Sequence, residues 1–365
     1  MLRSFRCFWL SISWLSTVSA SAQVTSANLL NHQTDQFVRQ LMDRAHVPGL
    51  SITIIRDGQL YYSQGYGLTK SDSTQRVTSE TIFEAASLSK PVFAYAVLQL
   101  VEQGVLDLDK PLFEYLPYPD AADDERYKKI TARLVLSHRT GFPNWRKNRK
   151  LPKLSMVAPP GERFGYSGEG YVYLQKVVEK ISGKPLNTIM TEQVFTPLKM
   201  TRSSYIWNPA FDANFGLPHD QEGQAETKYK SNMANAAYSL QTTADDYARF
   251  VLAIMTSRGL KPGTIDQMLS FQVRLPKSFS GGESLSPTLH WGLGFGLERT
   301  PESDYFWHWG DNDTYKCYIV GSRQRRDGVV YFTNSANGLR LVSELNRHFM
   351  GFDTSTVDFL GYKSN

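Results

Sequence analysis

A serine and a lysine stand three residues apart just before an uncharged segment, as Ser87 and Lys90 ahead of Pro91–Val101. On a helix, side chains at this spacing share one face and can meet. Proline is tolerated only in a first turn, so a helix is predicted to begin near Pro91. A lysine removed from water loses proton affinity and can act as a base toward a hydroxyl. The spacing therefore predicts a nucleophile with its base, although a helix cap beside an outward-pointing lysine would give the same pattern.

Two further motifs follow this pair along the chain. Tyr166-Ser167 stands in a glycine-rich turn before an expected helix, and His308-Trp309-Gly310 comes just before an expected hairpin. S-x-x-K, Y-S-x and H-x-G in this order resemble the serine β-lactamase and penicillin-binding protein superfamily. The likeness is greatest to the branch with class C β-lactamases, D-alanyl-D-alanine carboxypeptidase-like enzymes and related esterases. ITARLVLSHRTGFP, NAAYSLQTTADDYARFV and WGLGFGLE match further landmarks of that branch, so the resemblance covers nearly the whole mature chain.

The resemblance implies catalytic roles for four residues. Ser87 would be the acyl-accepting nucleophile, and Lys90 would take its proton or hold its hydroxyl. Tyr166 would pass a proton to the leaving group, and His308 would orient and polarise Tyr166. Such chemistry needs neither a metal nor a cofactor, and none of the seven histidines pairs with another at metal-ligand spacing.

The resemblance also implies positions that bind the substrate. The backbone N–H groups of Ser87 and Asp311 would form the oxyanion hole, and Gly310 would let the substrate backbone lie along an edge strand. Three residues depart from the usual pattern: Gly168 replaces a frequent Asn, Trp309 replaces a small residue, and Asp311 brings a carboxylate. A missing amide and a repelling charge weaken the binding of a β-lactam or a peptide carboxylate. The Asp311 carboxylate could instead attract an amine, which would favour aminopeptidase-like substrates. Poor β-lactam recognition with intact acyl transfer is therefore predicted.

Other reactive residues are interpreted as structural. GYSGEG nearly spells the G-x-S-x-G turn of α/β-hydrolases, but Glu169 stands in it where glycine is required, so Ser167 is not the predicted nucleophile. His138 in LSHRTG is interpreted as a structural histidine. Cys317 lies in a β-rich run and is interpreted as a buried thiol.

The N-terminus has the pattern of a secretory signal peptide. Arg3 and Arg6 precede a short apolar segment that ends in Ala20-Ser21-Ala22, so residues 1–22 are predicted to be cleaved near Ala22. An uncleaved anchor is the alternative, and the serines within the apolar run disfavour it. Cleavage would lower the formal net charge from +5 to +3, which gives no reason to expect nucleic acid as a partner. A periplasmic or extracellular protein is predicted.

The sequence pattern predicts β-strands and a helix at each end of the mature chain, and mostly helices in the middle. An Asp-Gly pair separates two β-rich runs in 50–67, and another lies inside the connection of the runs in 315–335. Helical spacing of apolar residues indicates terminal helices at 33–45 and 337–351. The sequence therefore predicts one α+β domain, an antiparallel sheet flanked by the N- and C-terminal helices with a mostly helical inserted region. The predicted domain is 23–365, with sheet halves at about 23–86 and 286–365 and the helical region at about 87–285.

One segment of the helical region is strongly basic. WRKNRKLPKLS holds five cations and no acid, namely Arg146, Lys147, Arg149, Lys150 and Lys153. The segment is either a solvated loop or a rim that attracts an anionic partner, such as a cell-envelope polymer or a membrane surface.

These observations favour an exported serine hydrolase that forms an acyl-enzyme with small esters or amides, D-amino-acid and peptidoglycan-related compounds among them. A class C-like β-lactamase is the second hypothesis. The third is a catalytically inactive relative that binds wall peptides or a partner protein, and the presence of all four predicted catalytic residues argues against it. The sequence does not decide the acyl donor or the oligomeric state.

Overall fold

The computed structural model describes residues 18–148 and 153–362. The chain divides into two compact units, Met1–Leu41 and Met42–Asn365. Helix α1 (Val18–Ala45) runs from the first unit into the second, so the helix predicted at its C-terminal end is present. The main unit carries all the predicted site residues.

Two predicted features fall partly outside the described residues. They are the signal peptide, of which residues 1–17 are not described, and the basic segment, of which Arg149 and Lys150 are not described. Within the part of the chain that is described, no helix combines the length and the apolar character needed to cross a membrane.

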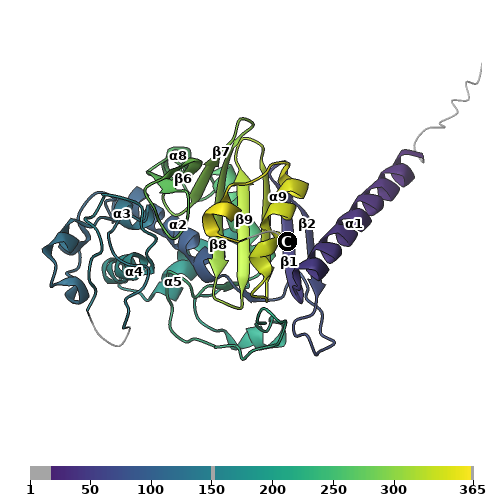
Figure 1. Cartoon of the computed structure of the whole chain (residues 1–365), viewed down its shortest axis with the longest axis horizontal. Helices are drawn as coiled ribbons and strands as arrows, with labels where there is room; N and C mark the ends of the chain where they lie inside the picture. The colour runs from purple at the N-terminus through teal and green to yellow at the C-terminus, as the bar shows by residue number, and fades with distance from the viewer. Residues whose placement is uncertain (1–17, 149–152, 363–365) are drawn as a thin grey trace, which may run out of the picture. The chain divides into compact units, whose positions relative to one another are not determined.

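The main unit is built on an eight-stranded sheet whose neighbouring strands all run antiparallel (Figure 1). The two ends of the chain meet in this sheet because β1 pairs with β10. The predicted antiparallel sheet is therefore confirmed. In spatial order, the strands are β2 (Gln59–Gly67), β1 (Gly49–Arg56), β10 (Asp327–Thr333), β9 (Lys316–Ser322), β8 (Asp304–Asp311), β7 (Gly296–Arg299), β6 (Leu285–Trp291) and β5 (Val273–Pro276).

The second half of the sheet begins earlier in the chain than predicted. Strand β5 lies inside the segment 87–285 that was predicted to be helical. It has four residues, ends in Pro276 and forms the edge of the sheet, where proline is tolerated. So short a strand gives almost no alternating pattern in the sequence, which explains the misplaced boundary.

The two Asp-Gly pairs have different roles. Asp57 and Gly58 form the β1–β2 turn with φ angles of 51° and 71°, as a two-residue hairpin requires. The second pair was predicted to lie in the β9–β10 connection, but that connection is 323–326 and the pair opens β10. A Cβ on Gly328 would lie 2.8 Å from the Met255 side chain, so this glycine permits close packing under α7 (Ala244–Thr256) instead of making a turn.

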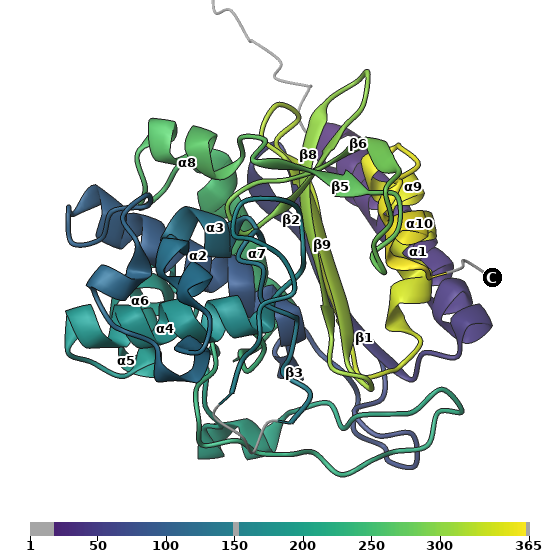
Figure 2. The same cartoon turned by 60° about the vertical axis from the view of Figure 1, so that its left-hand side comes forward.

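Helices lie on both sides of the sheet (Figure 2). Helix α7 (Ala244–Thr256) packs against β1, β9 and β10 on the side of the helical region, and α9 (Val342–Met350) packs against β10 from the other side. The predicted C-terminal helix is thus present, although its first turn is a 3₁₀ turn, Gly338–Leu341. The other α-helices of the main unit are α2 (Ser89–Glu102), α3 (Ala132–Leu136), α4 (Gly168–Ser182), α5 (Leu186–Met190), α6 (Thr196–Leu198), α8 (Pro262–Met268) and α10 (Thr356–Leu360).

Helix α2 is the buried helix that the uncharged segment predicts. Its residues from Ser89 to Leu98 are all buried, and Pro91 lies in its first turn. Burial of each large apolar side chain contributes roughly 1.5–3 kcal/mol, so the core fixes this helix firmly. The residues at its N-terminal end are held in place by the same packing.

Candidate active site

Ser87 lies in a sharp turn at the N-terminal end of α2. The short strand β3 (Phe83–Glu84) leads into a 3₁₀ turn, Ala86–Leu88, which joins α2 directly. Ala86 has a φ of 46°, and this left-handed conformation costs a residue with a side chain about 1–2 kcal/mol. The turn places the half-buried Ser87 at the wall of a cleft.

Lys90 is buried directly beneath Ser87. Its Nζ lies 3.1 Å from the Ser87 Oγ and donates a hydrogen bond to the Ala237 carbonyl at 2.8 Å. The side chain is only 1% exposed, and this burial lowers the pKa of Lys90 from 10.5 to about 7. Among the described residues, no carboxylate forms an ion pair that would hold the ammonium charged. The predicted contact between the two side chains is therefore present, and an outward-pointing lysine is excluded.

Tyr166 stands beside this pair, at the turn before α4. The Lys90 Nζ lies 4.8 Å from the centre of the Tyr166 ring. The Tyr166 hydroxyl is buried and has no partner in hydrogen-bond geometry within the described chain, although Ser87 is near enough to oppose the shift in its pKa. Burial raises the pKa of Tyr166 above its ordinary value, so the phenol stays protonated and can serve as a proton donor.

His308 is fully buried behind Tyr166. Its Nδ1 is 2.7 Å from the Trp309 carbonyl oxygen, which requires the proton on Nδ1 and leaves a lone pair on Nε2. The ring centres of His308 and Tyr166 are 6.3 Å apart, and the two side chains share no hydrogen bond. Burial, and then the charge of Lys90, lower the pKa of His308 to about 3. The imidazole is therefore neutral near neutral pH, and its predicted influence on Tyr166 stays a prediction.

His138 contributes to the same group of rings. Its ring centre is 4.1 Å from that of Tyr166. The Nδ1 atom accepts the backbone N–H of Ser167 at 3.0 Å, which fixes the position of the turn that carries Tyr166. His138 thus supports a predicted catalytic residue, in agreement with its interpretation as structural.

The other nucleophilic side chains near the site are occupied in the fold. Ser89 Oγ donates to the Ala86 carbonyl at 2.6 Å. Ser167 Oγ caps α4 by accepting the Gly170 N–H at 3.0 Å. Cys317 is a buried free thiol. The structural interpretation of Ser167 and Cys317 is therefore confirmed.

The H-x-G motif lies in the part of β8 that extends beyond the end of β7. Strand β8 lies between β9 and β7 in the sheet, so its first half, up to Trp307, is an interior strand. Its pairing with β7 ends at Trp307, however, and residues 308–311 pair with β9 alone. A Cβ on Gly310 would lie 2.4 Å from the Ala85 carbonyl oxygen and 2.2 Å from the Cys317 sulfur. Glycine is required here because β8 packs tightly against the serine turn.

Asp311 carries no free charge. One of its carboxylate oxygens forms an ion pair with Lys316, the residue opposite it on β9, and the other accepts a hydrogen bond from the Tyr362 hydroxyl. The prediction that Asp311 repels a substrate carboxylate assumed an unpaired charge, and it is wrong on that point. An ion pair at contact distance cancels most of the field that either charge would exert alone.

Gly168 has no room for the asparagine that is frequent at its position in the family. A Cβ on Gly168 would lie 2.5 Å from two ring carbons of Trp145. The neighbouring Asn144 accepts the Gly168 N–H through its side chain at 3.0 Å. Trp145 and Asn144 were not predicted as site residues. Trp145 opens the basic segment and Asn144 precedes it, and the only signal of that segment in the sequence is its charge.

Ser87 lines two cavities of the cleft. The larger, of about 600 Å³, is hereafter the polar arm, and the smaller, of about 240 Å³, is the aromatic arm. In the aromatic arm, the Trp309 ring lies 5.0 Å from that of Tyr166 and 5.2 Å from that of Phe279. The predicted bulk of Trp309 is therefore present on this side of the nucleophile. The polar arm includes Glu84, Trp145, Tyr229, Tyr238, Gln241 and Asp313.

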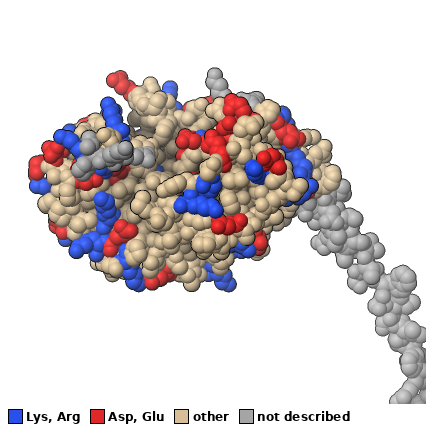
Figure 3. All heavy atoms as spheres, turned by 90° about the horizontal axis from the view of Figure 1, so that it is seen from below, with Lys and Arg blue, Asp and Glu red and all other residues tan. Residues whose placement is uncertain are grey.

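The described cations of the basic segment have structural partners or lie on the surface. Arg146 is 11% exposed and forms ion pairs with Asp120 at 2.8 Å and Glu169 at 2.7 Å, so it braces the first turn of α4. Lys153 pairs with Asp123 at 2.7 Å. Acidic and basic side chains are mixed over the face shown in Figure 3. An anionic partner of the segment stays a prediction, and Arg146 is not part of a solvated loop.

The fold and the Ser87–Lys90–Tyr166 arrangement are those of the serine β-lactamase and penicillin-binding protein superfamily, whose members are generally serine hydrolases. Residues 34–348 match the family described as Beta-lactamase, and the chain belongs to that family. No group of three His, Cys, Asp or Glu side chains in the described ranges is placed to hold a metal ion.

Related proteins are similar at low identity. Protein flp of Staphylococcus aureus (strain COL) is 22% identical over 335 residues, which cover 87% of this chain and 64% of that protein. Penicillin-binding protein 4* of Bacillus subtilis (strain 168) is 23% identical over 314 residues, which cover 76% of this chain and 66% of that protein. The chain thus spans about two thirds of the length of these relatives.

Two solved structures share the fold. An octameric penicillin-binding protein homologue from Pyrococcus abyssi has a TM-score of 0.76 at 24% identity, covering 88% of this chain and 78% of that one. The D-alanine carboxypeptidase AmpC from Burkholderia cenocepacia has a TM-score of 0.72 at 20% identity, covering 86% and 97%. These likenesses confirm the predicted fold class.

Proposed function

We propose that this protein is an exported serine hydrolase that cleaves small esters or amides through an acyl-enzyme on Ser87. One observation carries the proposal: the Lys90 Nζ lies 3.1 Å from the Ser87 Oγ, and burial lowers the pKa of Lys90 to about 7. Such a lysine is partly a neutral amine at neutral pH, and it can take the proton of the serine.

The site residues divide the steps of acyl transfer among them. Lys90 accepts the proton of Ser87 as the Oγ bonds to the acyl carbon. Tyr166, which its raised pKa keeps protonated, gives a proton to the leaving oxygen or nitrogen, and the Lys90 ammonium replaces that proton. The backbone N–H groups of Ser87 and Asp311 stabilise the oxyanion. Water then attacks the acyl-enzyme by the same steps in reverse.

The substrate class follows from the family and from the walls of the cleft. Similar proteins include a penicillin-binding protein and a D-alanine carboxypeptidase, so D-amino-acid and peptidoglycan-related amides are candidates beside simple esters. A class C-like β-lactamase is the second candidate because of the family match. Trp145 argues against it, since its ring fills the space beside Gly168 where a substrate-binding amide would stand.

The proposal is tested by labelling and by a substrate panel. A fluorophosphonate probe should form an adduct on Ser87, located by mass spectrometry. An activated short-chain ester, a chromogenic cephalosporin, a D-Ala-D-Ala peptide and D-amino-acid amides should then be compared, with Ser87→Ala as the control. An unlabelled protein that turns over none of these compounds would favour the inactive, peptide-binding relative.

A pair of variants tests the specificity. We expect the native enzyme to have a higher kcat/KM for the ester than for the cephalosporin. Gly168→Asn alone should destabilise the protein because of the 2.5 Å contacts with Trp145. Gly168→Asn with Trp145→Ala should relieve that clash and gain activity on the cephalosporin. A native preference for the cephalosporin would show that Trp145 does not limit β-lactam recognition.

A further inference from the structure

The charged residues that line the polar arm, among those the structure describes, are all acids. Glu84, Asp311 and Asp313 are on its wall, and the described residues that line either arm include no lysine or arginine. The cations that pair with two of these acids, Lys228 and Lys316, do not line the arm. The charges of Glu84 and Asp311 are therefore largely cancelled at a distance, and what these two acids offer a substrate in the arm is their carboxylate oxygens.

Glu84 lies on the wall of the polar arm, whereas the cation that pairs with it is buried. One of its carboxylate oxygens pairs with Lys228, and the other accepts the Asn312 side-chain N–H at 2.6 Å. Lys228 is only 8% exposed, and its ammonium lies near the rings of Trp207 and Tyr315, at 5.5 and 5.0 Å. The positive charge is buried away from the cleft while the carboxylate reaches its wall.

Asp313 supplies a negative charge without a cation. It is exposed, lines both arms, and forms no ion pair with any described residue. The backbone N–H of Asp313 donates to Asp311 at 2.9 Å, which fixes the turn at the mouth of the cleft. The described residues that line the arm thus carry a net negative charge.

Gln241 independently indicates that a ligand in the polar arm donates a hydrogen bond. It lines the polar arm, is 7% exposed, and its Oε1 has no partner among the described residues. Its Nε2 is already used, donating to the Ser239 carbonyl at 3.3 Å. A buried amide oxygen without a partner costs free energy unless a ligand or water donates to it.

Aromatic rings complete the wall. Trp145, Tyr229 and Tyr238 line the polar arm, and the rings of Trp145 and Tyr238 meet edge to face with centres 5.7 Å apart. Faces of such rings attract cations, most strongly where water is excluded. Carboxylates, an unpaired carbonyl and aromatic faces together match a group that is positively charged and donates several hydrogen bonds.

We propose that the polar arm binds an ammonium group, so that the substrates of Ser87 are esters or amides that carry a positively charged amine. This inference rests on the proposed function, because it assumes that Ser87 is acylated. It places the amine in the polar arm, on the side of Ser87 that Glu84 and Gln241 line.

The test compares activated esters that differ only in charge. Three esters of equal chain length end in an ammonium, a methyl or a carboxylate group, first in the acyl part and then, in a second set, in the alcohol part. In one of the two sets, kcat/KM should be at least about tenfold higher for the ammonium ester than for the methyl ester, and lowest for the carboxylate. Equal values in both sets, or a preference for the carboxylate, would overturn the inference.

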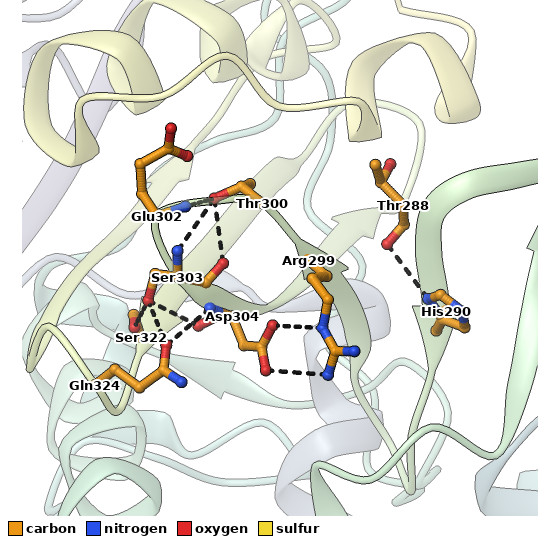
Figure 4. A network of polar contacts seen from close by, with 9 residues as sticks. All are labelled: Thr288, His290, Arg299, Thr300, Glu302, Ser303, Asp304, Ser322 and Gln324. Carbon is orange, nitrogen blue, oxygen red and sulfur yellow. Dashed lines mark hydrogen bonds and ion pairs between the residues drawn. The ribbon is translucent and has the colours of Figure 1, made fainter.

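A pair of charge-matched variants locates the effect. Asp313→Asn should lower the ammonium-to-methyl ratio of kcat/KM several-fold. Glu302→Gln removes an equal charge from the β7–β8 turn, where Figure 4 shows its carboxylate pointing away from the Arg299–Asp304 ion pair, and it should leave the ratio unchanged. A ratio that falls equally in both variants, or in neither, would contradict a role for Asp313 in binding the ammonium group.

Fluorophosphonate labelling separates the two possible failures. If Ser87 is labelled but charge has no effect on the ratio, only the ammonium inference fails. If Ser87 is not labelled and no ester is cleaved, the proposed function fails with it.

Discussion

The region behind Ser87 and the region in front of it differ in whether their charged side chains are paired. Behind it, the Lys90 ammonium is buried against the Ala237 carbonyl and the ring of Tyr166, with no carboxylate paired to it in the described chain. In front of it, Glu84 and Asp311 each have a cation of their own. Because these acids are already neutralised, they do not hold the proton on Lys90. The comparison explains how an acid-lined cleft can coexist with a lysine that is able to lose its proton.

The largest effect is expected from removal of the nucleophile. Ser87→Ala should lower kcat on an activated ester by a factor on the order of 10⁴–10⁶, because the acyl-enzyme can no longer form. The measurement is steady-state kinetics on the same ester for both proteins. Full activity in this variant, or a fluorophosphonate adduct on Ser89 or Ser167 in the native protein, would refute the assignment.

The next largest effect is expected from substitution of Lys90, in the region behind Ser87. A pKa lowered to about 7 means that Lys90 is neutral above that pH and charged below it, so kcat/KM should rise with pH through about 7. Lys90→Arg keeps a positive charge that cannot be removed, and it should cost roughly 10²–10⁴ in kcat. The pH–rate profile of each protein is the measurement.

His308 provides the control for that assignment. Because its pKa lies near 3, the imidazole is neutral on both sides of pH 7. His308→Gln should therefore leave the rising limb at the same pH, whatever it does to kcat. A limb that disappears in this variant would mean that His308, and not Lys90, titrates during catalysis.

A smaller effect should follow from breaking an ion pair in front of Ser87. Lys228→Met leaves the Glu84 carboxylate, three residues before Ser87, without its cation. An unpaired negative charge nearby favours the ammonium form of Lys90, so its pKa should rise and the limb should move up by roughly half to one pH unit. Adding Glu84→Gln to Lys228→Met should return the limb to its original place. A limb that does not move in the single variant would show that the two regions are electrostatically independent.

The smallest effect is expected at Asp311. Tyr362→Phe removes one hydrogen bond to its carboxylate, but the ion pair with Lys316 remains. A hydrogen bond to a carboxylate contributes about 1.5–3 kcal/mol to the stability of the fold. This one touches no reacting atom, so KM should change by no more than about tenfold while kcat stays nearly constant. Thermal unfolding of both proteins controls for loss of the C-terminal packing. A large fall in kcat would instead assign Tyr362 a part in forming the oxyanion hole.

The sequence by itself determined the features that depend on neighbours along the chain. Ser87 and Lys90 meet because a helical turn brings residues three apart to one face. Asp57 and Gly58 form a hairpin turn because both tolerate positive φ. The order of the three motifs indicated the family, and through it the antiparallel sheet.

Only the tertiary structure decided the charge and the space within the site. The pKa of Lys90 depends on burial beneath Ala237, which lies 147 positions further along the chain. The Asp311 carboxylate accepts a hydrogen bond from Tyr362, and the space beside Gly168 is filled by Trp145. Contacts of this kind join residues that no local pattern relates, because the path of the whole chain brings them together. The sequence therefore indicated which groups do the chemistry, whereas the fold set their protonation and the shape of the cleft.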